Sequence, residues 1–262
     1  MEKVEKQYRN VANLNSRIQI HQKYSTNKKD WHEWLFEQYR IGPNSNVLEL
    51  GCGDGTFWFK NKGRIPKSWT VTLSDFSSGM LADAQNKLGK APNMSFRKID
   101  IQDIPYEDDQ FDAVIANHIL YHVPDRQHAI QEIRRVLKPH GVFYASTVGE
   151  KHMMELNELL KNFDPSLSDV LTNVQARAFG LENGEEQLRA YFQHIQLKPF
   201  PGGLLIDDVQ AIADYILSSG TEVRHVLAGE KLKDFIDYLE REKQKNNGWI
   251  HVTKATGLFE SS

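Results

Sequence analysis

Residues 46–56 read Asn46-Val47-Leu48-Glu49-Leu50-Gly51-Cys52-Gly53-Asp54-Gly55-Thr56, and this stretch decides the fold that we predict for the chain. Its first half contains the short apolar run of a buried strand, and the run stops at three glycines on alternate positions. Glycine adopts positive φ angles without strain and has no Cβ atom to keep a ligand from the backbone. The stretch therefore predicts a strand that ends in a ligand-binding turn.

A carboxylate at the end of the next predicted strand makes this turn a candidate nucleoside site. Residues 70–74 read as a strand and lead to Asp75, which follows Gly55 by 20 residues. That spacing places a carboxylate at the tip of the neighbouring strand, where it can accept hydrogen bonds from both hydroxyls of a ribose. At position 56 a dinucleotide fingerprint needs glycine and a P-loop needs lysine, but Thr56 stands there. The pattern disfavours NAD and excludes ATP bound through a P-loop.

Length and charge limit the class of protein. With 262 residues, the chain is long enough for one large α/β domain with an attached cap. It carries 32 Lys and Arg against 35 Asp and Glu, a formal charge of -3. Because this balance creates no strong positive field, we expect no nucleic-acid partner.

The cellular compartment is predicted from the cysteine content and from the apolar segments of the sequence. Its one cysteine, Cys52, lies in the glycine turn, so neither an intrachain disulfide nor a cysteine metal cluster is expected. The chain opens Met-Glu-Lys-Val-Glu-Lys without an apolar signal segment, and no window approaches 18 uninterrupted apolar residues. We therefore predict a cytoplasmic protein that does not insert into a membrane and holds no metal.

Short apolar runs alternate with helical patterns from residue 47 to about residue 147. Strands are predicted at 47–50, 70–73, 94–99, 111–116 and 141–147, and helices at 56–62, 79–88 and 126–137. Repeated strand-helix units favour a parallel sheet with right-handed crossovers, whose ligands bind at the carboxyl ends of the strands. Polar residues stand at or near such ends: Glu49, Asp75, Asp100 and Asn117.

The rest of the chain is assigned to four kinds of segment. Residues 1–40 are predicted to form an N-terminal helical arm, with Asp30 capping a helix, and residues 41–150 the α/β core. Residues 151–184 and 203–248 are predicted to form a helical lid, with helices at 151–163, 207–217 and 222–243. Residues 185–202 and 249–262 supply a helix at 185–192 and the last strands, at 195–199 and 249–259.

Several motifs, in this order and spacing over about residues 45–147, resemble those of class I S-adenosylmethionine-dependent methyltransferases, in particular the small-molecule branch of the ubiquinone and menaquinone biosynthesis type. The matching segments are Val47-Leu48-Glu49-Leu50-Gly51-Cys52-Gly53-Asp54-Gly55, Val71-Thr72-Leu73-Ser74-Asp75-Phe76-Ser77, Gly79-Met80-Leu81, Asp100-Ile101-Gln102-Asp103-Ile104-Pro105, Phe111-Asp112-Ala113-Val114-Ile115-Ala116-Asn117 and Leu137-Lys138-Pro139-His140-Gly141. In the last segment, His140 replaces a glycine of the turn usual in the family. The resemblance implies a Rossmann-like sheet of seven strands, mostly parallel with the last strand antiparallel, and a helical cap.

The resemblance also implies which residues bind S-adenosylmethionine. Gly51 and Gly53 would admit its methionine portion, and Glu49 and Asn117 would lie at the same end. Asp75 would bind the ribose. The adenine would lie between Phe76 and Met80, with Asp100 and the Ile101 backbone at its edge. We add Arg17, His21 and Tyr24 of the arm as residues that reach the ligand if the arm folds over it, while simple packing of the arm on the core is the alternative.

Candidate bases follow the fourth predicted strand. His118 and His122 are four residues apart and would share a face if the segment were helical. A zinc protease site needs Glu directly after the first histidine, and Ile119 stands there instead. We therefore predict His118 and His122 as catalytic bases, with hydrogen-bonded or packed histidines as the alternative.

These features predict an enzyme that transfers a methyl group from S-adenosylmethionine to the oxygen, nitrogen or carbon of a small molecule, with S-adenosylhomocysteine as the product. Two other readings stay open: a regulatory protein that binds the cofactor without turnover, and a protein or RNA methyltransferase. No Asn-Pro-Pro-Tyr type of motif follows the fourth strand, which speaks against the last of these. The sequence identifies neither the acceptor nor the oligomeric state.

Overall fold

The computed structural model describes residues 19–168, 171, 173–219 and 221–262. The chain divides into two compact units. The sheet unit consists of residues 29–149, 175–200 and 256–262, and the helical unit consists of residues 150–174, 201–255 and the chain before residue 29. Among the described residues, no helix has the length and apolarity needed to cross a bilayer.

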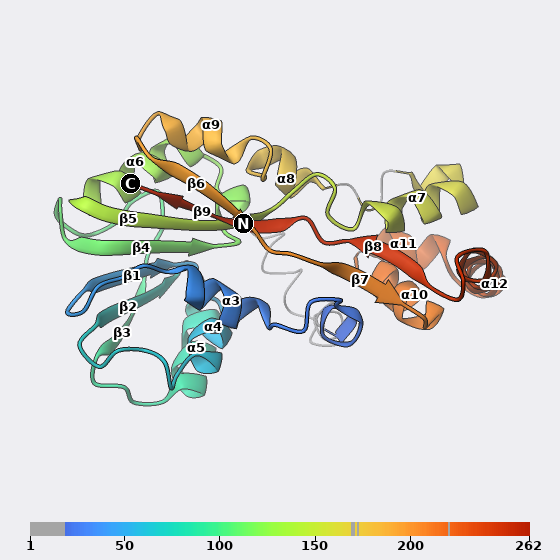
Figure 1. Cartoon of the computed structure of the whole chain (residues 1–262), viewed down its shortest axis with the longest axis horizontal. Helices are drawn as coiled ribbons and strands as arrows, with labels where there is room; N and C mark the ends of the chain where they lie inside the picture. The colour runs from blue at the N-terminus through green and yellow to red at the C-terminus, as the bar shows by residue number, and fades with distance from the viewer. Residues whose placement is uncertain (1–18, 169–170, 172, 220) are drawn as a thin grey trace. The chain divides into compact units, whose positions relative to one another are not determined.

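Seven strands form the sheet of the first unit, in the order β3-β2-β1-β4-β5-β9-β6 (Figure 1). β9 runs antiparallel to both of its neighbours, while the pairs from β3 to β5 are parallel. The fold class predicted from the sequence is confirmed. The strands are β1 (Asn46–Leu50), β2 (Thr70–Asp75), β3 (Met94–Lys98), β4 (Phe111–Asn117), β5 (Leu137–Val148), β6 (Ile195–Pro199) and β9 (Thr256–Ser261).

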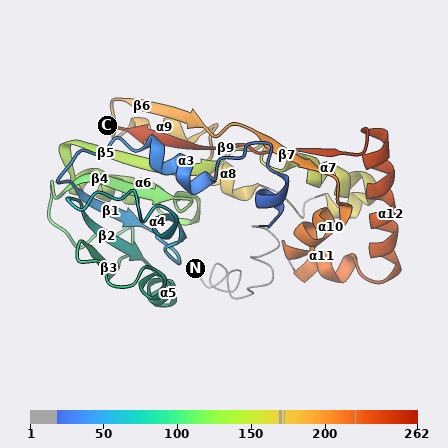
Figure 2. The same ribbon diagram turned by 60° about the horizontal axis from the view of Figure 1, so that its bottom comes forward.

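Helices cover both faces of this sheet. One hydrophobic cluster includes residues of α3 (Trp31–Gln38), α4 (Thr56–Lys60) and α5 (Ser78–Leu88). Another includes residues of α6 (Arg126–Val136) and α9 (Gly184–Arg189). Figure 2 shows these helices beside the sheet. The central strands are apolar along most of their length because both faces are buried. The remaining short elements of this part of the chain are η1 (Leu120–His122) and α8 (Val174–Ala178).

Side chains of the sequence set where these helices begin. Asp30 accepts a hydrogen bond from the His32 N–H at 2.9 Å, so the predicted cap of the arm helix is confirmed. Ser77 and Asp125 cap α5 and α6 in the same way. Each cap satisfies an N–H group that has no partner inside its helix.

The helical unit has a hydrophobic cluster of its own. Residues 19–24 are helical and contribute Ile20 and Tyr24 to the cluster. A short antiparallel pair of strands, β7 (Gly203–Ile206) and β8 (Ile250–Thr253), belongs to this unit. Its other elements are α7 (Met154–Phe163), η2 (Pro165–Leu167), α10 (Val209–Ser218), α11 (Thr221–Val226) and α12 (Glu230–Lys245).

Three predicted boundaries are wrong. The apolar run 249–259 is not one strand, because β8 pairs with β7 while β9 pairs with β5 and β6. The helix predicted at 222–243 is divided into α11 and α12, because Gly229 between them has a φ of 58° that a helix does not allow. Residues 138–141, expected to form a turn, lie inside β5, whose register shifts opposite Phe111 and Ala113.

Candidate functional site

The glycine turn begins directly after β1 and is fixed to β2. Gly51 and Cys52 both donate their N–H groups to the Ser74 carbonyl at 2.8 Å. Gly51 has a φ of 79°, and a Cβ atom there would lie 2.9 Å from Ile119 Cγ1. Gly53 also has a positive φ, 55°, but a Cβ atom there would meet nothing within 4 Å. The turn is therefore packed at Gly51 and borders open space at Gly53.

Asp75 joins the end of β2 to this turn. Its Oδ2 accepts a hydrogen bond from the Gly53 N–H at 2.9 Å, and its Oδ1 accepts one from the Ser77 N–H at 2.8 Å. A carboxylate has about four acceptor positions, so two hydrogen bonds leave it able to accept more. The helix cap is Ser77 rather than Asp75. The carboxylate thus holds the turn and still has lone pairs for ligand hydroxyls.

An exposed aromatic ring follows Asp75. Phe76 is 44% exposed, and the Lys98 ammonium lies 5.4 Å from the centre of its ring. Met80, one turn into α5, is half-buried. An exposed phenylalanine beside a flexible thioether side chain offers a flat apolar surface next to the carboxylate. A planar base can stack there.

Asp100 and Ile101 follow β3 and differ in what they expose. Asp100 Oδ1 accepts hydrogen bonds from the Gln102 N–H at 2.9 Å and from Gln102 Nε2 at 3.2 Å. The Ile101 side chain is buried in the cluster that α6 covers, so only its backbone is suited to meet a ligand. Asp100 is half-buried, and its carboxylate can accept further hydrogen bonds.

A hydrogen-bonded chain surrounds Glu49, the one acidic residue of β1. Glu49 is 1% exposed; its Oε2 accepts from Trp58 Nε1, and its Oε1 accepts from Asn117 Nδ2 at 3.2 Å. The Tyr39 hydroxyl donates to Asn117 Oδ1 at 3.1 Å. Burial raises the pKa of Glu49 to about 7, and the Asp75 charge acts in the same direction, while the two hydrogen bonds to Glu49 oppose the shift.

Tyr39 and Trp58 are the site residues that sequence reasoning missed. Tyr39 caps the end of α3, and burial raises the pKa of its hydroxyl well above the usual value. Trp58 lies on α4 and is fully buried. A glutamate inside an apolar strand signals that donors must surround it, but nothing in the sequence says which residues supply them.

The two candidate bases do not share a helix. His118 has a φ of 54°, which is uncommon outside glycine, and it precedes η1, where His122 is the last residue. The prediction of one helix face is therefore wrong. Burial, followed by the charges of His32 and His122, lowers the pKa of His118 to about 4, and burial also lowers the pKa of His122.

Aromatic rings surround His118. The Trp31 ring lies 5.5 Å from the His118 ring and the Tyr121 ring lies 6.2 Å from it, measured between centroids. Trp31 is held by stacking on Trp34 at 5.3 Å and by an edge contact with Phe200 at 5.2 Å. His118 thus follows Asn117 at the carboxyl end of β4, among aromatic rings.

The residues predicted in the arm are placed differently. Arg17 lies outside the described residues. His21 and Tyr24 belong to the helical unit, where the Tyr24 hydroxyl donates to Asp208 Oδ2 at 3.2 Å. Both are half-buried or buried within that unit, so packing of this part of the arm is what the structure shows.

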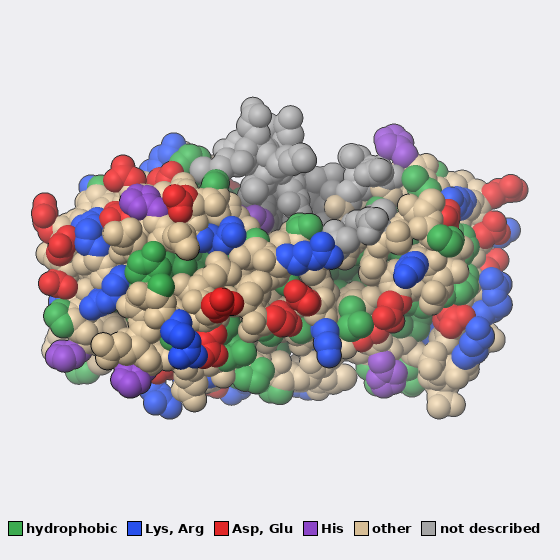
Figure 3. All heavy atoms as spheres, turned by 90° about the horizontal axis from the view of Figure 1, so that it is seen from above, with side chains coloured by type: hydrophobic (Ala, Val, Ile, Leu, Met, Phe, Trp, Pro, Cys, Tyr) green, Lys and Arg blue, Asp and Glu red, His purple; other side chains and the backbone are tan. Residues whose placement is uncertain are grey.

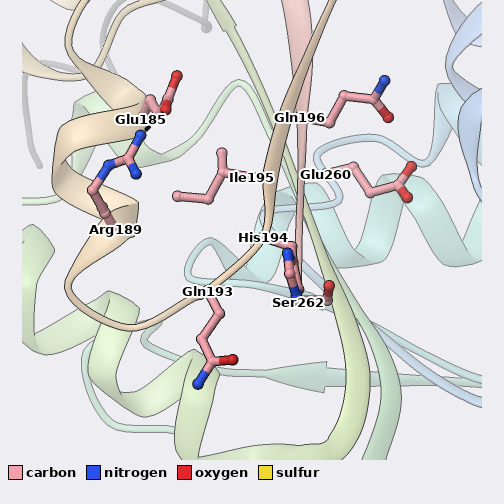
Figure 4. Close-up of a pocket in the computed structure, with 8 residues that line it drawn as sticks. All are labelled: Glu185, Arg189, Gln193, His194, Ile195, Gln196, Glu260 and Ser262. Carbon is pink, nitrogen blue, oxygen red and sulfur yellow. Dashed lines mark hydrogen bonds and ion pairs between the residues drawn. The ribbon is translucent and has the colours of Figure 1, made fainter.

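A cavity of about 340 Å³ in the sheet unit lies away from these residues (Figure 4). Because β9 is antiparallel, its carboxyl end lies beside the amino end of the parallel β5. The Gln193 and His194 N–H groups donate to the Ser262 carbonyl, and Arg189 pairs with Glu185 on α9. These contacts lie at the end of the sheet opposite the glycine turn. The cavity is lined by Glu185, Arg189, Gln193, His194, Ile195, Gln196, Glu260 and Ser262.

Comparison with known proteins gives the same assignment as this geometry. Residues 48–145 match a family model described as a methyltransferase domain. Malonyl-[acyl-carrier protein] O-methyltransferase 1 of Ilyobacter polytropus is 34% identical over 122 residues, 47% of this chain and 45% of that protein. Demethylmenaquinone methyltransferase of Staphylococcus carnosus is 25% identical over 223 residues, 78% of this chain and 90% of that protein. The chain spans about half the length of several curated relatives.

Solved structures share the fold at low identity. YcgJ of Bacillus subtilis has a TM-score of 0.56 at 17% identity, covering 88% of this chain and 96% of that one. The [4+2]-cyclase SpnF has a TM-score of 0.55 at 18% identity, covering 95% and 91%. These structures show the fold alone, and the match at residues 48–145 is to the methyltransferase domain as a family.

Proposed function

We propose that the chain transfers the methyl group of S-adenosylmethionine to a small molecule at the carboxyl end of its sheet. A solved N-methyltransferase of Haemonchus contortus with this fold holds S-adenosylhomocysteine, which supports this choice of cofactor. The observation that supports the proposal most is the link between Asp75 and the Gly53 N–H, beside space that a Cβ atom at Gly53 would enter freely. This arrangement fits a ribose at the carboxylate and a ligand backbone against the turn.

The residues beside this link fit the rest of the cofactor. We assign the adenine to the exposed face of Phe76, with Met80 at its other side and Asp100 accepting from its exocyclic amine. The Ile101 backbone would meet the edge of the ring. Gly51 keeps the turn close to Ile119 and leaves the methionine portion room beside Gly53.

Glu49 is the residue that we assign to the positive charge of the methionine portion. Its pKa of about 7 means that the free protein holds this carboxyl only partly ionised at neutral pH. A cation nearby stabilises the ionised form, so cofactor binding and ionisation of Glu49 should support each other. Asn117, with Tyr39 behind it, fixes the orientation of the carboxylate.

The bound cofactor supplies a methyl group already activated by a positive sulfur. The protein has to hold an acceptor in line with that methyl, and good alignment of reactants is worth roughly 7–11 kcal/mol. When the nucleophile loses a proton during the transfer, His118 is the first predicted base that can accept it. Its pKa of about 4 keeps the ring neutral at neutral pH but also makes it a weaker base than an ordinary imidazole, so the role suits a nucleophile that loses its proton readily. His122 is the second candidate for this role.

The surroundings of His118 favour a small acceptor with apolar or aromatic surface. Trp31 and Tyr121 flank the imidazole, and aromatic rings attract flat apolar groups. On the face drawn in Figure 3, acidic and basic side chains are interspersed rather than gathered into a basic stripe. This distribution supports a small molecule over RNA as the acceptor.

Calorimetry with S-adenosylmethionine and S-adenosylhomocysteine tests the cofactor site. Asp75→Ala removes the acceptor of two ribose hydrogen bonds to a charged group, so we expect the Kd to rise about 100-fold or more. Asp83→Ala is the control, because Asp83 is an exposed carboxylate on α5. Equal affinities of wild type and Asp75→Ala, or no binding by wild type, would refute the site.

Turnover is tested separately with methyl-labelled cofactor and fractionated metabolite extracts, read by mass spectrometry. We expect label in a small molecule and not in protein or RNA. Tight cofactor binding without transfer to any fraction would instead support a regulatory protein.

A further inference from the structure

The helical unit contains a cluster of titratable side chains that the methyl-transfer proposal does not use. The His21 ring stacks on the His152 ring, with 6.0 Å between centroids and 21° between planes. The Tyr215 ring of α10 meets the His21 ring edge to face at 6.3 Å. Three segments far apart in the sequence thus bring two imidazoles and one phenol together in a single unit.

One atom of this cluster lacks a partner. His21 Nδ1 is buried and has no hydrogen-bond partner among the described residues. Buried polar side-chain atoms in folded proteins nearly always have one, because an unmade hydrogen bond destabilises the folded state. A ligand atom that bonds to Nδ1 would complete the site.

A positive charge lies at the cluster. Lys254 follows β8, and its ammonium is 3.5 Å from Ser25 Oγ. Burial, and after it the charge of Lys254, lowers the pKa of His21 to about 4. The imidazole is therefore neutral at physiological pH and lies in a positive potential. Such a site disfavours a cation and attracts an anion.

We propose that His21, His152, Tyr215 and Lys254 form a binding site for the anionic oxygen group of a small organic ligand. A neutral imidazole can carry its proton on either nitrogen, so Nδ1 can donate to a ligand oxygen while the Lys254 ammonium balances the charge. All four side chains are partly exposed at the surface of the unit, while Nδ1 itself is buried, so a ligand oxygen reaches this atom only if the neighbouring side chains move aside.

Metal binding fits these residues less well. Among the residues that the structure describes, no group of three His, Cys, Asp or Glu side chains is placed to hold a metal ion. The neighbouring ammonium also repels cations. The chemistry of the cluster therefore selects a carboxylate or a phosphate over a metal.

The probes are benzoate and inorganic phosphate, titrated into the full chain and followed by the ring resonances of labelled histidines. We expect benzoate, phosphate or both to shift the His21 resonances in a saturable manner, and the stronger probe identifies the ligand group. Benzyl alcohol has nearly the same shape as benzoate without the charge, and it should bind at least tenfold more weakly. The proposal is overturned if neither anion moves the resonances or if the alcohol binds as well as benzoate.

Variants distinguish a binding site from a packed histidine. His21→Phe keeps an aromatic ring and removes the buried atom that lacks a partner, so Tm should stay the same or rise while probe affinity falls at least tenfold. Lys254→Met should lower the affinity by a similar factor, and it carries the test if His21→Phe fails to fold. His225→Asn changes an exposed histidine of α11 and should leave binding unchanged. Wild-type affinity in Lys254→Met would overturn the proposal.

The result does not depend on methyl transfer, because the titration needs neither S-adenosylmethionine nor an acceptor. Loss of cofactor binding in Asp75→Ala with intact benzoate binding, and the reverse in Lys254→Met, would show two separate sites. A failure of the anion titration leaves the cofactor assignment untouched.

Discussion

Replacing Glu49 by glutamine should remove a pH dependence from the stability of the protein, because a buried carboxyl with a raised pKa is replaced by a group that does not ionise. Glu49 is 1% exposed in β1, between Leu48 and Leu50, which are buried as well. A carboxylate in such a place loses its hydration, and the hydrogen bonds from Trp58 and Asn117 compensate only in part. Glutamine keeps the shape of the side chain and cannot ionise. Trp58 Nε1 and Asn117 Nδ2 both donate to Glu49, so the amide nitrogen of glutamine leaves one of them without an acceptor, at a cost of about 1–3 kcal/mol that does not vary with pH.

The size of the effect follows from the pKa of Glu49. The group has an ordinary pKa of 4.5 and a pKa of about 7 in the folded protein, where burial is the largest cause. The difference of about 2.5 pH units corresponds to about 3 kcal/mol, at roughly 1.4 kcal/mol per unit. Because the pKa of Glu49 is raised in the folded protein, the protonated carboxyl contributes about 3 kcal/mol of stability that is fully present below pH 4.5 and is lost as the pH rises through 7. The glutamine side chain does not titrate, so this contribution to the unfolding free energy does not change with pH in the variant.

Urea unfolding of wild type and Glu49→Gln between pH 4.5 and pH 8 measures the effect. The difference in unfolding free energy should change by about 3 kcal/mol in favour of the variant as the pH rises. Other titrating groups are common to both proteins and cancel in the difference. A difference that stays constant with pH would show that Glu49 titrates normally, and the burial argument would then be wrong.

Three further predictions concern the same site. Gly51→Ala should lower Tm and abolish cofactor binding, because its Cβ atom would lie 2.9 Å from the Ile119 side chain. Gly53→Ala should fold, with its free energy of unfolding lowered by about 1–2 kcal/mol, and should still bind the cofactor more weakly; tight binding by this variant would contradict the assignment of the glycine turn to the cofactor. His118→Ala should lower kcat about 10²- to 10⁴-fold, and the wild-type kcat at saturating S-adenosylmethionine should be flat between about pH 6 and pH 8 because the His118 ring is neutral there; an unchanged kcat in the variant would exclude His118 as the base. Tyr39→Phe should cost about 1 kcal/mol in urea unfolding and weaken cofactor binding through Asn117, whereas unchanged affinity would make the hydroxyl purely structural.

The central part of the fold could be predicted because its signals are local. The strands of residues 46–148 are short apolar runs that end at glycine or at a polar residue, and the helices begin at Asp30, Ser77 and Asp125, whose side chains cap them. The order of elements in this region was predicted for that reason. The late part of the chain was predicted less evenly: the strand at 195–199 and the helix at 207–217 were found, but the pairing of the last strands was not.

The apolar run 249–259 shows why the pairing of the last strands could not be predicted. Its residues suit a strand throughout, but β8 and β9 join different sheets, and the choice depends on partners elsewhere in the chain. Strand β7 was missed: its partner strand β8 lies far along the chain, at residues 250–253, and residues 203–206 are part of the predicted helical lid. Such pairings depend on long-range contacts that a local pattern does not contain.

The site residues also fall into those that a local sequence signal identifies and those that only the folded chain brings together. The counted spacing from Gly55 identified Asp75, since strand and helix lengths in such units vary little. Trp58 and Tyr39 could not be identified, because α4 and the end of α3 bring them to Glu49 only in the folded chain. His118 was found, but its left-handed backbone was not, since histidine is not a residue that signals such a conformation as strongly as glycine does.

The fold by itself does not decide the reaction, because the [4+2]-cyclase SpnF has the same fold. Glu49 offers a test at the level of the site. Above pH 7 the ionised, buried Glu49 has an electrostatic cost that glutamine avoids, and this cost is explained if the carboxylate binds a cation that the neutral amide cannot hold. The Glu49→Gln protein should therefore bind S-adenosylmethionine more weakly than wild type above pH 7, and the two affinities should approach each other as the pH falls and the wild-type carboxyl takes up its proton. A variant that binds the cofactor as tightly as wild type above pH 7 would leave Glu49 without a role in holding it.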